Sequence, residues 1–238
     1  MVTISSPITE IISDNPLLEC VVERFGFEKK KHTLGLQEIC AGTNNDPHFV
    51  LEVLKAFSED CPFPSEELKK FPIAAIIHYL RETHTFYLDK KIPEIELSFT
   101  GLSKNYSFSH PQLLILANLF MDYKKDLIEH VEFEEYIFFP YILELLKVKN
   151  HKKELKAYGL DKYSIALFIQ EHHHEEAVLT SIRASIEKKF KKTYTPLPFK
   201  VFLNQIKSLE KDLLIHARIE DEVLLPMALL LEKEVKNN

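Results

Sequence analysis

Two stretches of the sequence repeat one pattern of residues that bind metals. They are HVEFEEYIFFP, residues 130–140, and HARIEDEVLLP, residues 216–226. Both place a histidine, a glutamate four residues later, a second acid directly after it and a proline at the end. A histidine and a glutamate at this spacing project from the same face of a helix. Two such helices facing each other would present two imidazoles and two carboxylates to a common centre, a donor set that suits a buried pair of metal ions.

Four long amphipathic segments are expected to hold these residues. Hydrophobic residues make up 45% of the chain and glycines number 5, a composition that favours helices with a substantial core. Prolines and glycines lie at the joints between the segments. Four long helices with short connections predict an all-α fold, an antiparallel four-helix bundle. The expected segments are Phe71–Lys91, His110–Lys147, Tyr163–Lys189 and Phe199–Glu234.

Apolar residues in each segment recur in steps of three and four, which predicts one inward-facing stripe per helix. The first stripe consists of Ile73, Ile77, Leu80, His84 and Tyr87. The third consists of Ile165, Phe168, His172, Glu175, Leu179, Ile182 and Ile186. The second and fourth are predicted to run through the repeated pattern without a missed step, as Leu116, Phe120, Tyr123, Leu127, His130, Glu134, Ile137, Tyr141 and Leu145, and as Phe202, Ile206, Leu209, Leu213, His216, Glu220, Val223, Met227 and Leu230. A polar cluster therefore interrupts every stripe near its middle.

Buried carboxylates of this kind must be protonated, paired or bound to metal, because an unpaired charge in a dry interior is very unfavourable. A hydrogen-bonded His–Glu network without metal is the alternative, and it explains a single core histidine well. Four histidines and two carboxylates at one depth favour metal instead. Structural zinc usually takes cysteine ligands, and calcium and magnesium prefer oxygen. Mixed imidazole and carboxylate ligands fit two iron ions, with manganese or zinc ranked lower.

These motifs resemble the hemerythrin-like family, and within it the di-iron proteins associated with repair of iron–sulfur clusters damaged by oxidative and nitrosative stress. The two repeated stretches carry most of the resemblance, together with Glu82-Thr83-His84 and Glu171-His172. The resemblance implies an oxo- or hydroxo-bridged pair of iron ions. Its implied ligands are the imidazoles of His84, His130, His172 and His216 and the bridging carboxylates of Glu134 and Glu220.

Composition and breaking signals also predict a division of the chain. A small helical N-terminal domain is expected over residues 1–57, followed by a proline-rich linker over 58–70 and the four-helix bundle over 71–238. The N-terminal part is similar to the family's accessory domain, which normally carries a Cys-Cys-Gly-Gly turn. Here Lys30-Lys31-His32-Thr33 replaces that turn, which argues against thiol-based iron donation. We interpret Cys40 as a small buried apolar residue rather than a reactive thiol.

Three further histidines are candidates near the metals. His110 fits either the entry to a helix, with Ser109 as the N-cap, or an extra ligand. His173 and His174 adjoin His172, which we prefer as the ligand because it lies on the apolar stripe.

The resemblance implies iron donation or chemistry on dioxygen or nitric oxide, with damaged iron–sulfur proteins as partners. The alternative is a protein that binds or senses dioxygen, nitric oxide or iron without turnover. The sequence leaves open whether the protein is an enzyme, such as a nitric oxide or oxygen reductase, since no catalytic group is evident beyond the metal ligands.

Composition and sequence patterns limit the partners and the cellular compartment that we expect. A net charge of -6 argues against nucleic acid as a partner, and no apolar run is long enough to span a membrane. The chain lacks a signal peptide pattern and its 3 cysteines form no disulfide framework, so we expect a cytoplasmic protein. A homodimer is compatible with the sequence, which does not decide the oligomeric state.

Overall fold

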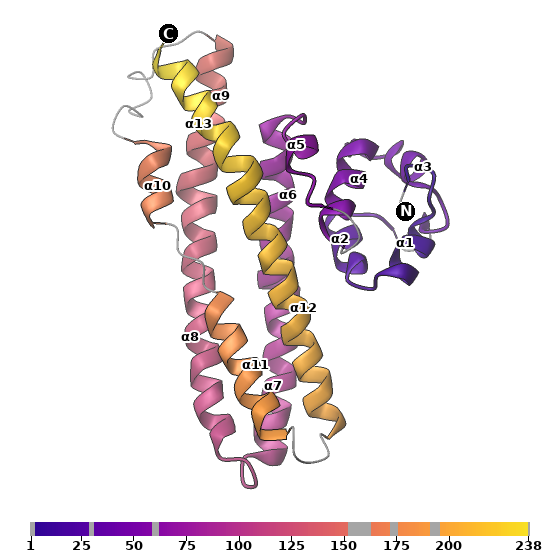
Figure 1. The fold of residues 1–238 in the computed structure, drawn as a ribbon, viewed down its shortest axis with the longest axis vertical. Helices are drawn as coiled ribbons and strands as arrows, with labels where there is room; N and C mark the ends of the chain where they lie inside the picture. The colour runs from indigo at the N-terminus through magenta and orange to yellow at the C-terminus, as the bar shows by residue number, and fades with distance from the viewer. Residues whose placement is uncertain are drawn as a thin grey trace. The chain divides into compact units, whose positions relative to one another are not determined.

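The computed structural model of the protein is shown in Figure 1. It describes residues 3–28, 31–58, 62–151, 163–171, 176–190 and 196–237. Every regular element in these ranges is a helix, so the predicted all-α class is confirmed. Within the same ranges, no helix combines the length and apolarity that crossing a bilayer requires.

The chain divides into two compact units. Residues 1–83 and 218–230 form the first unit, and residues 84–217 and 231–238 form the second. The expected linker over 58–70 and the domain boundaries on either side of it stay a prediction.

Several short helices make up much of the first unit, as the sequence predicts. They are α1 (Ile8–Asp14), α2 (Leu18–Arg24), α3 (Leu36–Cys40), α4 (Pro47–Ala56) and α5 (Ser65–Leu68), followed by the first part of α6 (Ile73–Phe86). The start of α4 illustrates why these helices begin where they do. The Asp46 carboxylate accepts hydrogen bonds from the backbone N–H groups of His48 and Phe49, and Pro47 occupies the first turn, where a missing N–H costs nothing.

An aromatic cluster forms part of the core of the first unit. The ring of Phe25 stacks on that of Tyr79 at 5.3 Å and meets the ring of Phe49 edge-on at 6.2 Å. Gly26 lets the chain turn at this point, because its φ of 70° is a backbone conformation that side chains disfavour. Its N–H bonds the carbonyl of Glu23, which ends α2 and places Phe25 in the core.

Four helices of the second unit enclose a common core, and successive helices run in opposite directions (Figure 1). They are α7 (Ile92–Tyr106), α8 (Gln112–Phe133), α11 (Glu176–Phe190) and α12 (Leu197–Ile219). Helix α8 packs against both α7 and α11. Helix α12 meets α11 through the ion pair of Arg183 with Glu210, 2.6 Å apart, and meets α7 where Phe99 stacks on Phe202 at 4.9 Å.

A buried polar group joins further elements of this unit. These elements are α9 (Phe139–His151), α10 (Ile165–Glu171) and the C-terminal end of α13 (Leu225–Lys236). The Tyr141 hydroxyl donates a 2.5 Å hydrogen bond to the Glu232 carboxylate, which also accepts from the backbone N–H of Ile165. Burial and this hydrogen bond raise the pKa of Tyr141 well above its ordinary value, so the phenol stays protonated.

Among the described residues, three wide π-helical turns interrupt the long helices, and each ends in front of a proline. They are η2 (Tyr87–Lys91), η3 (Glu134–Phe138) and η6 (Glu220–Leu224), followed two residues later by Pro93, Pro140 and Pro226. In each, the residue before the proline donates its N–H to the carbonyl five residues back. A proline has no N–H and its ring crowds the carbonyl four residues back, so a wider turn relieves the clash.

The wide turns accompany two corrections to the predicted stripes, although Tyr141, Leu145 and Val223 are buried as predicted. Ile137 and Leu230 were predicted to face inward, but they are 43% and 59% exposed. Phe138 and Leu231, one position later, are buried in their place. A π turn accommodates one residue more than an α turn, so side chains beyond it rotate relative to a regular helix. Ahead of the wide turns the stripes agree with the prediction wherever their side chains are described, although His130 is only half-buried.

Candidate metal centre

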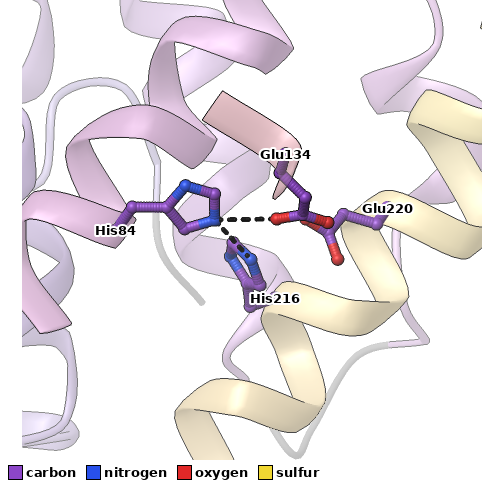
Figure 2. A group of neighbouring side chains, drawn as sticks. All are labelled: His84, Glu134, His216 and Glu220. Atoms are coloured by element: carbon purple, nitrogen blue, oxygen red, sulfur yellow. Dashed lines mark hydrogen bonds and ion pairs between the residues drawn. The ribbon is translucent and has the colours of Figure 1, made fainter. Parts of the chain in front are cut away.

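Four of the predicted ligands gather in one buried group, as Figure 2 shows. His84 lies near the end of α6 and His216 near the end of α12, while Glu134 and Glu220 are the first residues of η3 and η6. Each of the four side chains contributes one nitrogen or oxygen atom, and these four atoms all lie within 4.8 Å of one another. The side chains are no more than 6% exposed, so water has little access to them.

His84 is the residue on which the shortest contacts converge. Its Nε2 lies 3.1 Å from a carboxylate oxygen of Glu134 and 3.2 Å from the Nε2 of His216. Its Nδ1 lies 2.8 Å from a carboxylate oxygen of Glu135, the residue that follows Glu134. Both nitrogens of one imidazole therefore face carboxylates.

A neutral imidazole cannot satisfy both carboxylates, because it carries one N–H and one lone pair. If the Nδ1–H is donated to Glu135, the Nε2 lone pair faces the Glu134 oxygen at 3.1 Å. Two electron-rich atoms at that distance attract each other only through a positive charge between them. That charge is either a proton shared between these two atoms or a metal ion held by His84, Glu134 and His216.

The donor set fits a divalent transition-metal ion. Two imidazole nitrogens and two carboxylate oxygens suit iron, manganese or zinc, whereas calcium and magnesium favour sites made of oxygen alone. The carboxylates of Glu134 and Glu220 also supply negative charge, which offsets that of a buried cation. The buried His/Glu cluster can therefore hold a metal ion.

Of the two remaining predicted ligands, the structure describes His130 but not His172. The Nε2 of His130 lies 3.6 Å from Glu134, and its side chain is 20% exposed, so it borders the cluster. His172, with its neighbours His173, His174 and Glu175, lies outside the described residues. Metal binding by the six predicted ligands stays a prediction.

His110 lies at the other end of α8 from Glu134. Its ring packs against those of Tyr106 and Phe199, and one ring nitrogen lies 2.9 Å from the Ser109 hydroxyl. The prediction that Ser109 caps the helix is wrong, because α8 begins at Gln112 and the Ser109 hydroxyl bonds the carbonyl of Tyr106. His110 thus contacts two aromatic rings and a hydroxyl, and metal contact by this histidine stays a prediction.

Residues outside the predicted ligand set support the cluster. The ring of Phe139 stacks in parallel on that of His84, with 5.6 Å between the centroids. The ring of Tyr87 meets that of His216 edge-on at 5.7 Å, and its hydroxyl bonds the buried carboxylate of Asp212. Asp212 could have been found from spacing, because it lies one helical turn before His216.

Comparison with known proteins finds a similarity that extends over nearly the whole chain. No protein-family model matches. The chain is 18% identical over 239 residues to the iron-sulfur cluster repair protein ScdA of Staphylococcus haemolyticus. The alignment covers 94% of this chain and 98% of that protein, so the similarity includes both the short N-terminal helices and the segments that hold the cluster.

Proposed function

We propose that the protein is a non-haem di-iron protein of the iron–sulfur cluster repair type, acting under oxidative or nitrosative stress. The buried group of His84, Glu134, His216 and Glu220 is the observation that carries this proposal. The similarity to a protein named for iron–sulfur cluster repair supports a repair function for this chain. The hemerythrin-like motifs of the sequence support iron rather than another metal.

In this proposal each residue has a defined part. Glu134 and Glu220 would bridge two iron ions, and His84, His130, His172 and His216 would complete their coordination. Bound iron would supply redox chemistry toward dioxygen or nitric oxide, or be released to a damaged cluster. Burial of the four described donors excludes water from the site, and the helices on which they lie hold them in place.

Metal analysis of the purified protein tests the centre. We expect about two iron ions per chain in protein isolated from its native host, with the absorption of an oxo-bridged pair. Replacing both carboxylates, Glu134→Ala with Glu220→Ala, should abolish iron binding. A matched control replaces Glu132 and Glu222, which lie two residues away on the same helices and outside the cluster. Iron content that survives the first double substitution would rule out the site.

Two activity measurements separate repair from binding. Recovery of a partner enzyme whose iron–sulfur cluster was damaged by nitric oxide should depend on the iron-loaded protein and fail with the double variant. Anaerobic incubation with nitric oxide and an added electron donor should give a quantifiable reduced product in more than stoichiometric amount over the iron centre if the centre turns over. Stoichiometric binding without product, and without recovery of the enzyme, would instead support the binding or sensing alternative.

A further inference from the structure

The two carboxylates at the start of η3 contact opposite sides of one imidazole. Glu134 faces the Nε2 of His84 at 3.1 Å, and Glu135 faces the Nδ1 at 2.8 Å. In the repeated sequence pattern Glu135 is merely the acid that follows the predicted ligand. In the structure its side chain is 25% exposed and turned toward α6 rather than toward solvent alone.

We infer that Glu135 is a positioning residue for His84, an inference that rests on the proposed metal centre. A carboxylate that accepts the Nδ1–H fixes the tautomer with its lone pair on Nε2. It also sets the rotation of the ring, since the Nδ1–H must point at Glu135. Nε2 is then directed at the atoms of Glu134 and His216 before any metal binds.

Phe139 completes the support of this ring. It stacks on the face of His84 with an angle of 8° between the two planes. The stacking restricts tilting of the imidazole, while the hydrogen bond to Glu135 restricts its rotation. Both residues come from the same stretch of chain as Glu134, five residues or fewer away, so one short segment supplies a ligand and the two groups that orient another ligand.

The partial exposure of Glu135 distinguishes it from the ligands. Glu134 is fully buried, whereas Glu135 borders solvent and need not carry a charge into a dry interior. A carboxylate placed there strengthens the basicity of His84 through the hydrogen bond without competing for the metal. Its removal should weaken metal binding while leaving the fold intact.

Titration of the metal-free protein with Co²⁺, followed by the visible absorption of the bound ion, tests the inference. Glu135→Ala should raise the dissociation constant for Co²⁺ by about 10- to 100-fold, the usual effect of removing such a partner. Glu135→Gln keeps an acceptor for the Nδ1–H and should restore part of the loss, together with the wild-type absorption spectrum. Glu132→Gln, an equal change of charge on an exposed residue of α8, should leave both unchanged.

The outcomes separate this inference from the proposed function. If wild-type protein binds neither Co²⁺ nor Fe²⁺, the metal centre itself is wrong and the inference falls with it. If wild-type protein binds and Glu135→Ala binds equally well, the centre stands and Glu135 has no positioning role. If the metal-free variants melt at a temperature close to that of wild type, the loss of affinity is local to the site. If Glu135→Gln weakens metal binding as much as Glu135→Ala does, the inference is overturned.

Discussion

The hydroxyl of Tyr87 donates a 2.9 Å hydrogen bond to the carboxylate of Asp212, a residue 125 positions away in the sequence. Both side chains are essentially inaccessible to solvent. The bond joins the start of η2 to α12, one turn before His216, and the ring of Tyr87 packs on the imidazole of His216. It therefore fixes α12, the helix that carries His216 and leads directly into Glu220 at the start of η6.

Tyr87→Phe should lower the free energy of unfolding of the metal-free protein by about 1–3 kcal/mol, because it removes a donor from a buried carboxylate. Equilibrium unfolding in urea measures the change. Tyr136→Phe is the control, since Tyr136 is 76% exposed and its hydroxyl can bond to water in either state. Equal stability of the two variants would mean that the bond does not hold α12 in place.

Pro226→Ala tests whether the wide turn at Glu220 is needed for the site. The new N–H can donate to the carbonyl of Glu222, which favours a regular α turn. Loss of one residue from the turn would rotate Glu220 relative to the buried stripe beyond it by about 100°. We therefore expect metal affinity to fall by about tenfold, an effect comparable to loss of a supporting residue.

Metal titration and circular dichroism of Pro226→Ala give the measurement. Pro111→Ala is the control, because Pro111 is the N-cap of α8 and does not follow a wide turn. Unchanged affinity in Pro226→Ala, with helix content retained, would show that the turn keeps its width without the proline.

Cys40 should behave as a buried structural thiol. Burial, together with the carboxylate of Asp46, raises its pKa to about 11. The folded state thus holds this proton more tightly than the unfolded chain, so the thiol contributes stability below its ordinary pKa. That contribution is lost as the pH rises toward 11.

Two measurements check the behaviour of Cys40. Unfolding free energy should fall more steeply with pH above about 9 in wild type than in Cys40→Ala. Alkylation by iodoacetamide at pH 8 should be much slower at Cys40 than at Cys20, which is half-buried, and the difference should vanish in urea. Fast alkylation of Cys40 in the folded protein would contradict the burial.

Much of the fold and several of the candidate ligands follow from local spacing. The apolar stripes identify the helices, and the depth at which they become polar identifies His84, Glu134, His216 and Glu220. Spacing failed where a proline altered the helix, since counting in steps of three and four assumes a regular turn. Ile137 and Leu230 were misplaced for that reason. Pro93, Pro140 and Pro226 were the available signal in the sequence, because each of these three lies two residues beyond a wide turn.

What the sequence determined by itself is which side chains share a face of one helix, because about 3.6 residues per turn fix that relationship. It could not decide which residues of different helices meet, because that depends on how the helices pack. Glu135 and Asp221 hold the same position in the repeated pattern, yet a contact with His84 is seen for Glu135. Likewise, the bond of Tyr87 with Asp212 exists because the tertiary structure brings η2 and α12 together.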